Sequence, residues 1–240
     1  VKAFRDNSYR VLTSYGVDES DMYLFVSNDE DLNNYKEEYP KANVIKGDKG
    51  IVGIDNFIVD YFDEGEEYIY LNDDVEDLLT LKDEKLVSLN TEDFVKLNEL
   101  LFRELKCNNF TYGGLYLCDN KMFMSKQQEI RKDLNIVLDG YSACINNKNV
   151  KLTHFEGIND NWFSDYEKSI LHFKDRGGII RLNRYTLKNT LFESDVILNK
   201  KKDNHKVNAE DMVKKYPEYI SSIKEKKNGW YSLRFRRIKI

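Results

Sequence analysis

The sequence predicts an α/β protein with a mixed central sheet flanked by helices, and two observations point to this class. Short apolar runs that are typical of buried strands alternate with segments of helical periodicity in the first third of the chain. One of these runs ends abruptly in a cluster of carboxylates. Open α/β sheets bind ligands at the carboxyl ends of their strands, so this cluster also predicts a ligand site.

Length and composition limit the class of protein. A chain of 240 residues can bury a full core, and nothing in it forces two domains, so we expect residues 1–240 to form a single domain. The 37 basic and 42 acidic residues give a formal charge of −5, so any contact with nucleic acid requires a local patch. We find no apolar run of membrane-spanning length, no signal peptide and no CxxC pair. We therefore expect a cytoplasmic protein with no membrane contact and no obligate protein partner.

The first third of the chain alternates between helix and strand patterns. Helical periodicity up to Val17 is followed by a strand at Tyr23–Val26, a helix over 28–39 and a strand over 43–45. Glycines at 47, 50 and 53 then indicate a loop that leads into a helix over 54–62. Alternation of this kind predicts a parallel sheet with crossover helices.

The acidic cluster follows the strand-like run Tyr68–Leu71 and consists of Asn72, Asp73 and Asp74. Mg²⁺ and Mn²⁺ prefer oxygen ligands, and they are commonly held by one or two protein carboxylates together with water and substrate phosphates. Asp73 and Asp74 are therefore predicted metal ligands, with a nucleotide diphosphate as the natural partner. The alternative is that Asp74 caps a helix that begins near Val75.

Three of these segments together resemble the N-terminal half of a GT-A glycosyltransferase: Tyr23–Val26, Gly50–Ile58 and Tyr68–Val75. More narrowly, they resemble the group associated with TET/JBP oxygenases in phages and kinetoplastids. That group is thought to add sugars to hydroxymethylated pyrimidines in DNA, as in the making of base J. The resemblance implies a GT-A-like, Rossmann-related fold with a mixed central sheet flanked by helices. It also implies a nucleotide-sugar donor such as UDP-glucose, a Mn²⁺ or Mg²⁺ cofactor, a DNA acceptor and, for a viral source, the host cytoplasm.

The chain departs from the pattern of this group at three places. Asp55 stands where the Gly-Ile-x-x-Arg-Asn segment has arginine, while Asn56 keeps the asparagine. Asn72 replaces the first acid of Asp-Asp-Asp-Val, which leaves two carboxylates of a DxD-type motif. The group opens with a strand and a nucleotide-binding turn, whose remnant here would end at Arg5, so we expect that strand to be truncated or supplied otherwise. The resemblance thus implies donor contacts for Arg5, Asn56 and Asp73.

A second acidic segment lies at 162–169, at the start of a predicted helix that runs to Phe173. Asp165 stands at the place of the acid in the xED motif of GT-A enzymes, with Ser164 in place of the glutamate. An inverting transfer needs one carboxylate to take the proton of the acceptor hydroxyl, and we expect Asp165 to act as this base. Glu167 is a second candidate catalytic acid, although it points another way on a helix. The alternative for Asp165 is a first-turn acid that interacts with the helix dipole.

Other candidates come from later glycines and basic residues. Gly113-Gly114 allows close backbone approach, which in a GT-A enzyme would suit the wall of the sugar pocket, although a plain turn also explains it. Arg181 lies in a Gly-Gly-x-x-Arg-x-Asn segment like that of the resembled group, where it would assist at phosphate. Its alternative is surface charge at a strand end. His205 is a candidate third metal ligand, or an exposed histidine in a polar, lysine-rich loop.

The C-terminal part is predicted to hold a helix over 209–215 and a strand within 230–240. Leu233, Phe235 and Ile238 would turn inward. The basic residues would form a cationic face able to hold a DNA backbone, with Trp230 and Tyr231 available to stack on a base; these are Arg234, Arg236, Arg237 and Lys239. A sheet edge protected by charge is the alternative.

Taken together, the residues and the resemblance predict a metal-dependent, inverting hexosyltransferase that modifies a hydroxymethylated pyrimidine in DNA. Two other functions are compatible with the sequence. One is a GT-A transferase that acts on a glycan or protein, and the other is a non-catalytic nucleic-acid-binding module.

Overall fold

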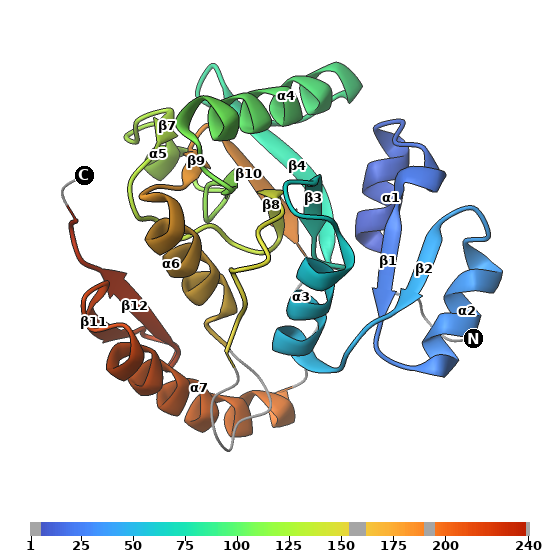
Figure 1. Ribbon diagram of the computed structural model, residues 1–240. Helices are drawn as coiled ribbons and strands as arrows, with labels where there is room; N and C mark the ends of the chain where they lie inside the picture. Colours follow the sequence, from blue (N-terminus) through green and yellow to red (C-terminus); the bar gives the residue numbers. More distant parts are fainter. Residues whose placement is uncertain (1–5, 154–161, 190–194, 239–240) are drawn as a thin grey trace.

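The computed structural model describes residues 6–153, 162–189 and 195–238, and for residues 195–203 the path of the backbone alone. The α/β class is confirmed, because helices pack on sheets of mixed strand direction (Figure 1).

The N-terminal part is a small parallel unit, in blue in Figure 1, whose two strands β1 and β2 pair in parallel. Its helices and strands lie close to their predicted positions: α1 Asn7–Ser14, β1 Tyr23–Val26, α2 Asp29–Glu38 and β2 Asn43–Lys46. A 3-10 turn that was not predicted, η1 Glu19–Asp21, precedes β1. The next helix, α3 Gly50–Tyr61, begins earlier than predicted. Gly50 and Gly53 are therefore helical, and the missing side chain of Gly53 leaves room for Asp48, whose Cβ would lie 3.0 Å from an added Cβ.

The central sheet has the strand order β3-β8-β6-β9-β7. Its strands are β3 Glu67–Leu71, β6 Tyr112–Leu115, β7 Ile130–Arg131, β8 Tyr141–Ile145 and β9 Ile180–Leu182. The predicted parallel continuation from β2 to β3 is wrong, since β3 pairs antiparallel with β8, and β6 and β9 are the parallel pair of this sheet. Residues 136–138, between β7 and β8, form no strand. The Val137 amide donates to Ser169 Oγ at 3.2 Å instead of to a neighbouring strand.

The two faces of the central sheet carry separate cores. Leu97, Leu101 and Leu105 of helix α4 Thr91–Asn108 are fully buried against one face. Alternation along the strands turns Tyr112 to the other face, where helix α6 Ser164–Arg176 packs. The polar residues discussed below lie on this α6 face.

Smaller elements surround this centre. After Asp74 the chain forms a strand, not the helix that was the alternative, and this β4 Val75–Lys82 lies in a three-stranded sheet with β5 Lys85–Ser88 and β10 Tyr185–Asn189. The short helix α5 spans Lys121–Met124.

The C-terminal part consists of helix α7 Asp195–Lys215 and the antiparallel hairpin β11 Ile220–Glu225 and β12 Tyr231–Phe235 (Figure 1). The helix is longer than the predicted 209–215. The predicted strand is confirmed, with Leu233 buried and the basic side chains of Arg234, Arg236 and Arg237 exposed, whereas Lys239 lies outside the described residues.

We expect Leu101→Ala to lower the free energy of unfolding by about 2–5 kcal/mol, because it removes buried methyl groups between α4 and the sheet. Val95 is on the same helix but 47% exposed, so Val95→Ala should cost less than about 0.5 kcal/mol. Urea denaturation measures both. Equal losses for the two variants would contradict the packing of α4 described above.

Candidate functional site

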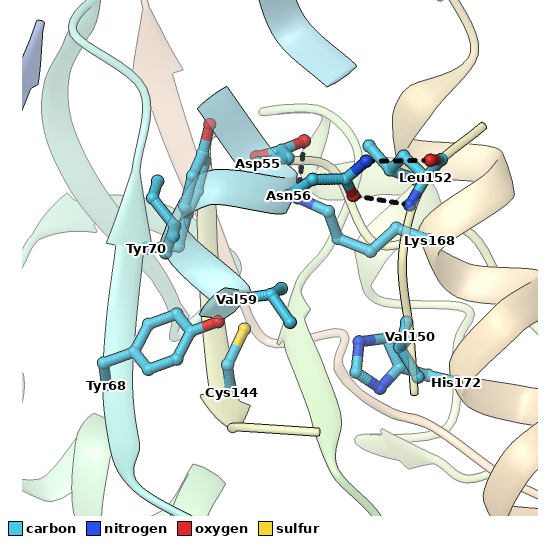
Figure 2. Close-up of a pocket in the computed structure, with 11 residues that line it drawn as sticks. Asp55, Asn56, Val59, Tyr68, Tyr70, Cys144, Val150, Leu152, Lys168 and His172 are labelled. Carbon is cyan, nitrogen blue, oxygen red and sulfur yellow. Dashed lines mark hydrogen bonds and ion pairs between the residues drawn. The ribbon is translucent and has the colours of Figure 1, made fainter. Parts of the chain in front are cut away.

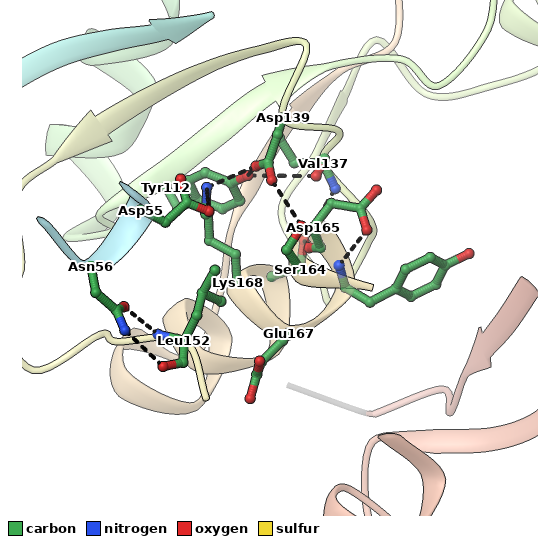
Figure 3. A network of polar contacts seen from close by, with 12 residues as sticks. Asp55, Asn56, Tyr112, Val137, Asp139, Leu152, Ser164, Asp165, Glu167 and Lys168 are labelled. Atoms are coloured by element: carbon green, nitrogen blue, oxygen red, sulfur yellow. Dashed lines mark hydrogen bonds and ion pairs between the residues drawn. The ribbon is translucent and has the colours of Figure 1, made fainter. Parts of the chain in front are cut away.

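A buried ammonium group lies among the polar residues of the α6 face (Figure 3). The Nζ atom of Lys168 is 2.9 Å from Asp139 Oδ1 and 3.2 Å from Asp55 Oδ2, and all three side chains are almost fully buried. Burial by itself lowers the pKa of Lys168, but the charges of Asp139 and Asp55 outweigh it and raise this pKa well above its usual value. Lys168 is therefore charged at neutral pH.

The ion pairs join three segments that are distant in sequence. Asp55 comes from α3, Lys168 from α6 and Asp139 from the loop before β8. Tyr112 Oη donates to Asp139 Oδ1 at 3.2 Å, and Ser164 Oγ donates to Asp139 Oδ2 at 3.5 Å. Burial raises the pKa of Asp55 to about 6, against the opposing effect of Lys168. Sequence reasoning did not assign Lys168 or Asp139 to an ion pair. A signal was present, because an aspartate in place of the arginine of the resembled pattern needs a cation once it is buried.

A small cavity of about 30 Å³ lies beside this network, bordered by Tyr68, Cys144 and His172 among others (Figure 2). It has room for one water molecule and not for a substrate. His172 Nδ1 is 2.8 Å from Thr111 Oγ1, and burial lowers its pKa to about 3, so His172 is neutral.

Asp165 lies in the first turn of α6 and is only partly buried, unlike its neighbours Ser164 and Glu167. Its Oδ1 accepts a hydrogen bond of 2.8 Å from the Tyr166 amide. Burial, with the charge of Asp139 second, raises the pKa of Asp165 to about 7. A carboxylate of this kind can accept a proton near neutral pH.

The predicted metal ligands Asp73 and Asp74 form a turn between β3 and β4. The β3–β8 ladder ends with Leu71 opposite Tyr141, so the turn that follows β3 and the Asp139 loop that precedes β8 leave the sheet at the same end of this strand pair. Because Asp139 contacts Ser164, the turn and the start of α6 lie at the same edge of the central sheet.

Asp73 and Asp74 present carboxylate oxygens, the kind of ligand that a hard cation prefers. Asp73 is exposed, and Asp74 is partly buried and accepts a hydrogen bond of 3.3 Å at Oδ2 from Asn189 Nδ2. The turn is held from α1, where Ser8 Oγ accepts from the Val75 amide at 3.2 Å. Within residues 6–153, 162–189 and 204–238, no three His, Cys, Asp or Glu side chains form a group that could hold a metal ion. One or two carboxylates are what Mg²⁺ commonly takes from a protein.

Glu167 faces away from Asp165, on the far side of α6 (Figure 3). It is fully buried and accepts from Lys215 Nζ at 2.8 Å and from Tyr216 Oη at 2.6 Å. It also accepts from the Thr153 amide at 3.3 Å. These contacts give Glu167 a structural role that ties α7 to α6, and they do not support the catalytic role predicted for it.

Two residues that were predicted to contact a nucleotide-sugar donor, Asn56 and Gly114, contact other parts of the protein instead. The amide of Asn56 donates to the Leu152 carbonyl at 2.9 Å and accepts from the Leu152 amide at 2.8 Å, which clamps α3 to the segment after β8. Gly114 is buried beneath Val137, whose Cγ1 would be 2.4 Å from an added Cβ. Neither residue is therefore available to contact a nucleotide-sugar donor. Arg5 lies outside the described residues.

Arg181 is 95% buried on β9, so surface charge is not its role. Its Nε donates to Asn183 Oδ1 at 2.8 Å and its Nη1 to the Ile136 carbonyl at 3.3 Å, and the ring of Tyr116 lies 5.2 Å away. Burial and the charge of Arg131 lower the pKa of Arg181 to about 10, which leaves it cationic. It supports the loop that leads to Asp139, and its phosphate contact stays a prediction.

His205 is on helix α7 and not in the polar loop that the sequence indicated. Its Nδ1 accepts from the Tyr231 amide at 3.3 Å, and the rings of Phe163 and Trp230 lie 4.6 and 4.9 Å from its own. Burial lowers its pKa to about 4. The prediction failed because α7 extends upstream and packs this residue under the hairpin, and a metal-ligand role is not supported.

Comparison with known proteins gives no match, whether with family models, curated proteins or solved structures. In the described part of the chain, no helix has both the length and the apolar character needed to cross a bilayer.

We expect Lys168→Met to lower the free energy of unfolding by about 3–5 kcal/mol near pH 7, because it leaves Asp55 and Asp139 buried without a cation. Loss of Lys168 raises the pKa of Asp55 further, because this cation lowers it in the unaltered protein. The cost of keeping the carboxylate charged is full above this raised pKa, so the loss should shrink as the pH falls below it toward about 4, where an unfolded carboxyl group titrates.

The matched control is Lys174→Met on the exposed side of the same helix, with an expected change within about 0.5 kcal/mol. Urea titrations at several pH values measure both variants. A loss for Lys168→Met that does not depend on pH would contradict the assignment of buried carboxylates as its cause.

Proposed function

We propose that the protein is a metal-dependent GT-A-type glycosyltransferase. It transfers a hexose from a nucleotide sugar such as UDP-glucose to the hydroxyl of a hydroxymethylated pyrimidine in DNA. The carrying observation is that Asp165, with a pKa near 7, lies at the same sheet edge as the Asp73–Asp74 turn. The order of the motifs along the chain, which resembles that of the base J type transferases, supports the same function.

The proposed reaction is a single displacement. The acceptor oxygen attacks the anomeric carbon, the bond from that carbon to the diphosphate oxygen breaks, and the configuration inverts. Asp165 takes the proton of the acceptor hydroxyl, for which it must be ionised. Asp73 and Asp74 would hold Mn²⁺ or Mg²⁺, which when bound neutralises charge on the departing diphosphate. Arg181 would assist at phosphate, and its buried guanidinium keeps its charge for this purpose.

The choice of DNA as acceptor is supported by the C-terminal hairpin. Arg234, Arg236 and Arg237 are exposed on or next to β12, in a chain whose overall charge is negative. Cationic groups so gathered can contact a phosphate backbone. A base inside a duplex reaches an active site by leaving the stack, so the proposed reaction includes base flipping or groove access.

The test is a screen for UDP release with several UDP-sugars, each with hydroxymethylated DNA, unmodified DNA or a free sugar. We expect metal-dependent release with the hydroxymethylated DNA alone. Release with free sugars and never with DNA would indicate a glycan acceptor. DNA binding that survives chelation, with no release from any donor, would indicate a non-catalytic binding module.

We expect Asp165→Asn to lower kcat by about 10²–10⁴-fold, because the amide cannot take the acceptor proton. In the unaltered protein the rate should rise with pH through about 7, since the ionised form of Asp165 is the active one. Initial rates of UDP release across a pH series measure both effects. Asp60→Asn, an exposed change on α3, is the control, and full activity in Asp165→Asn would remove the base assignment.

We expect Asp73→Asn to lower activity at limiting metal by at least about 10²-fold, because it removes a carboxylate from the cation. Asp73 is exposed, so thermal unfolding should be unchanged. Titration of activity with Mn²⁺ measures the effect. An unaltered metal dependence would show that the turn does not hold the cation.

A further inference from the structure

Asp139 is a buried carboxylate that faces the first turns of α6 (Figure 3). Its Oδ2 accepts from Ser164 Oγ at 3.5 Å, and its Oδ1 accepts from Lys168 Nζ at 2.9 Å. Tyr112 Oη on β6 also donates to Oδ1, at 3.2 Å. One carboxylate thus contacts residues on both sides of Asp165 in the helix and is fixed to the central sheet.

The charges of this network do not cancel. Asp55 and Asp139 are two carboxylates around the single cation of Lys168. Asp55 would be enough to neutralise Lys168, so stability alone does not explain the second acid. Asp139 is the member of the pair that also contacts Ser164, next to Asp165. The charge of Asp139 therefore lies beside the residue that precedes Asp165 in the helix.

We propose that Asp139 is a positioning residue for Asp165, which orients the first turn of α6 and directs a fixed negative charge at the Asp165 carboxylate. Lys168 holds the Asp139 carboxylate in place through their ion pair. The consequence for catalysis rests on the proposed function, whereas the effect of Asp139 on Asp165 does not.

The groups that face Asp165 come from three elements. They are Asp139 in the loop before β8, Lys168 and Tyr166 on α6, and Tyr112 on β6. Burial has the largest effect on the pKa of Asp165 and raises it, Asp139 raises it further, and Lys168 lowers it. Loss of the Asp139 charge should thus make Asp165 a weaker base, ionised at lower pH.

The test is a titration of the Asp165 carboxyl carbon by ¹³C NMR, with its signal identified by its absence in Asp165→Asn. We expect a midpoint near 7 in the unaltered protein and a midpoint lower by about one pH unit in Asp139→Asn. If the proposed function holds, the acidic limb of kcat/KM moves in the same direction and kcat falls.

Two control variants separate charge from position. Asp133→Asn removes a half-exposed acid of the same loop that pairs with Arg131, and it should leave the Asp165 midpoint unchanged. Ser164→Ala removes the hydroxyl contact but keeps the charge of Asp139, so the titration midpoint of Asp165 should also be unchanged. Should Asp139→Asn fail to fold, Asp139→Glu keeps the charge but displaces it, and we expect a retained midpoint with a lowered kcat.

An unchanged midpoint in folded Asp139→Asn, or Asp139→Glu with unchanged kcat, would overturn the proposal. A protein without any transferase activity whose midpoint still shifts would refute the proposed function and leave the action of Asp139 on Asp165 intact. Transferase activity together with an unmoved midpoint would support the proposed function and refute the action of Asp139 on Asp165.

Discussion

The ammonium group of Lys168, shared between Asp55 and Asp139, is the interaction on which the arrangement of the site depends. A buried charge is tolerated only when it is paired, so each of the three segments that carry these residues constrains the other two. Helix α3, helix α6 and the loop before β8 are thereby held at one face of the central sheet. Hydrophobic burial is not directional and would permit these elements to slide, whereas ion pairs near 3 Å fix their register.

Helix α6 turns acidic side chains to two different environments. On one side, Asp165 is partly exposed at the sheet edge, with the Lys168–Asp139 pair behind it. On the other side, Glu167 is fully buried and holds Lys215 and Tyr216 of the C-terminal part. Two acids that lie two residues apart thus differ in exposure and in partners because the helix turns them to different environments. The partly exposed one is suited to proton transfer, and the buried one to anchoring α7.

The proposed glycosyltransferase differs from the pattern it resembles in a way that the buried network explains. Asp55 occupies the place of an arginine, and a cation comes from α6 as Lys168 instead. The charge at this position is therefore the reverse of that in the resembled pattern, and it is paired within the chain. In the same region Asn56 binds the main chain of Leu152, which secures the helix that carries Asp55. The residues next to the proposed site thus serve mainly to position its parts.

The sequence by itself determined the local elements and the class, because these follow from short-range periodicity and turn chemistry. The strand Tyr23–Val26 and the inward-facing Leu233 are where the pattern placed them. Only the tertiary structure decided which strands pair and which polar groups meet. The antiparallel partner of β3, the burial of His205 and the meeting of Asp55 with Lys168 each depend on contacts between residues distant in the chain. Periodicity within a segment carries no information about the partner of that segment, so these features had to be read from the fold.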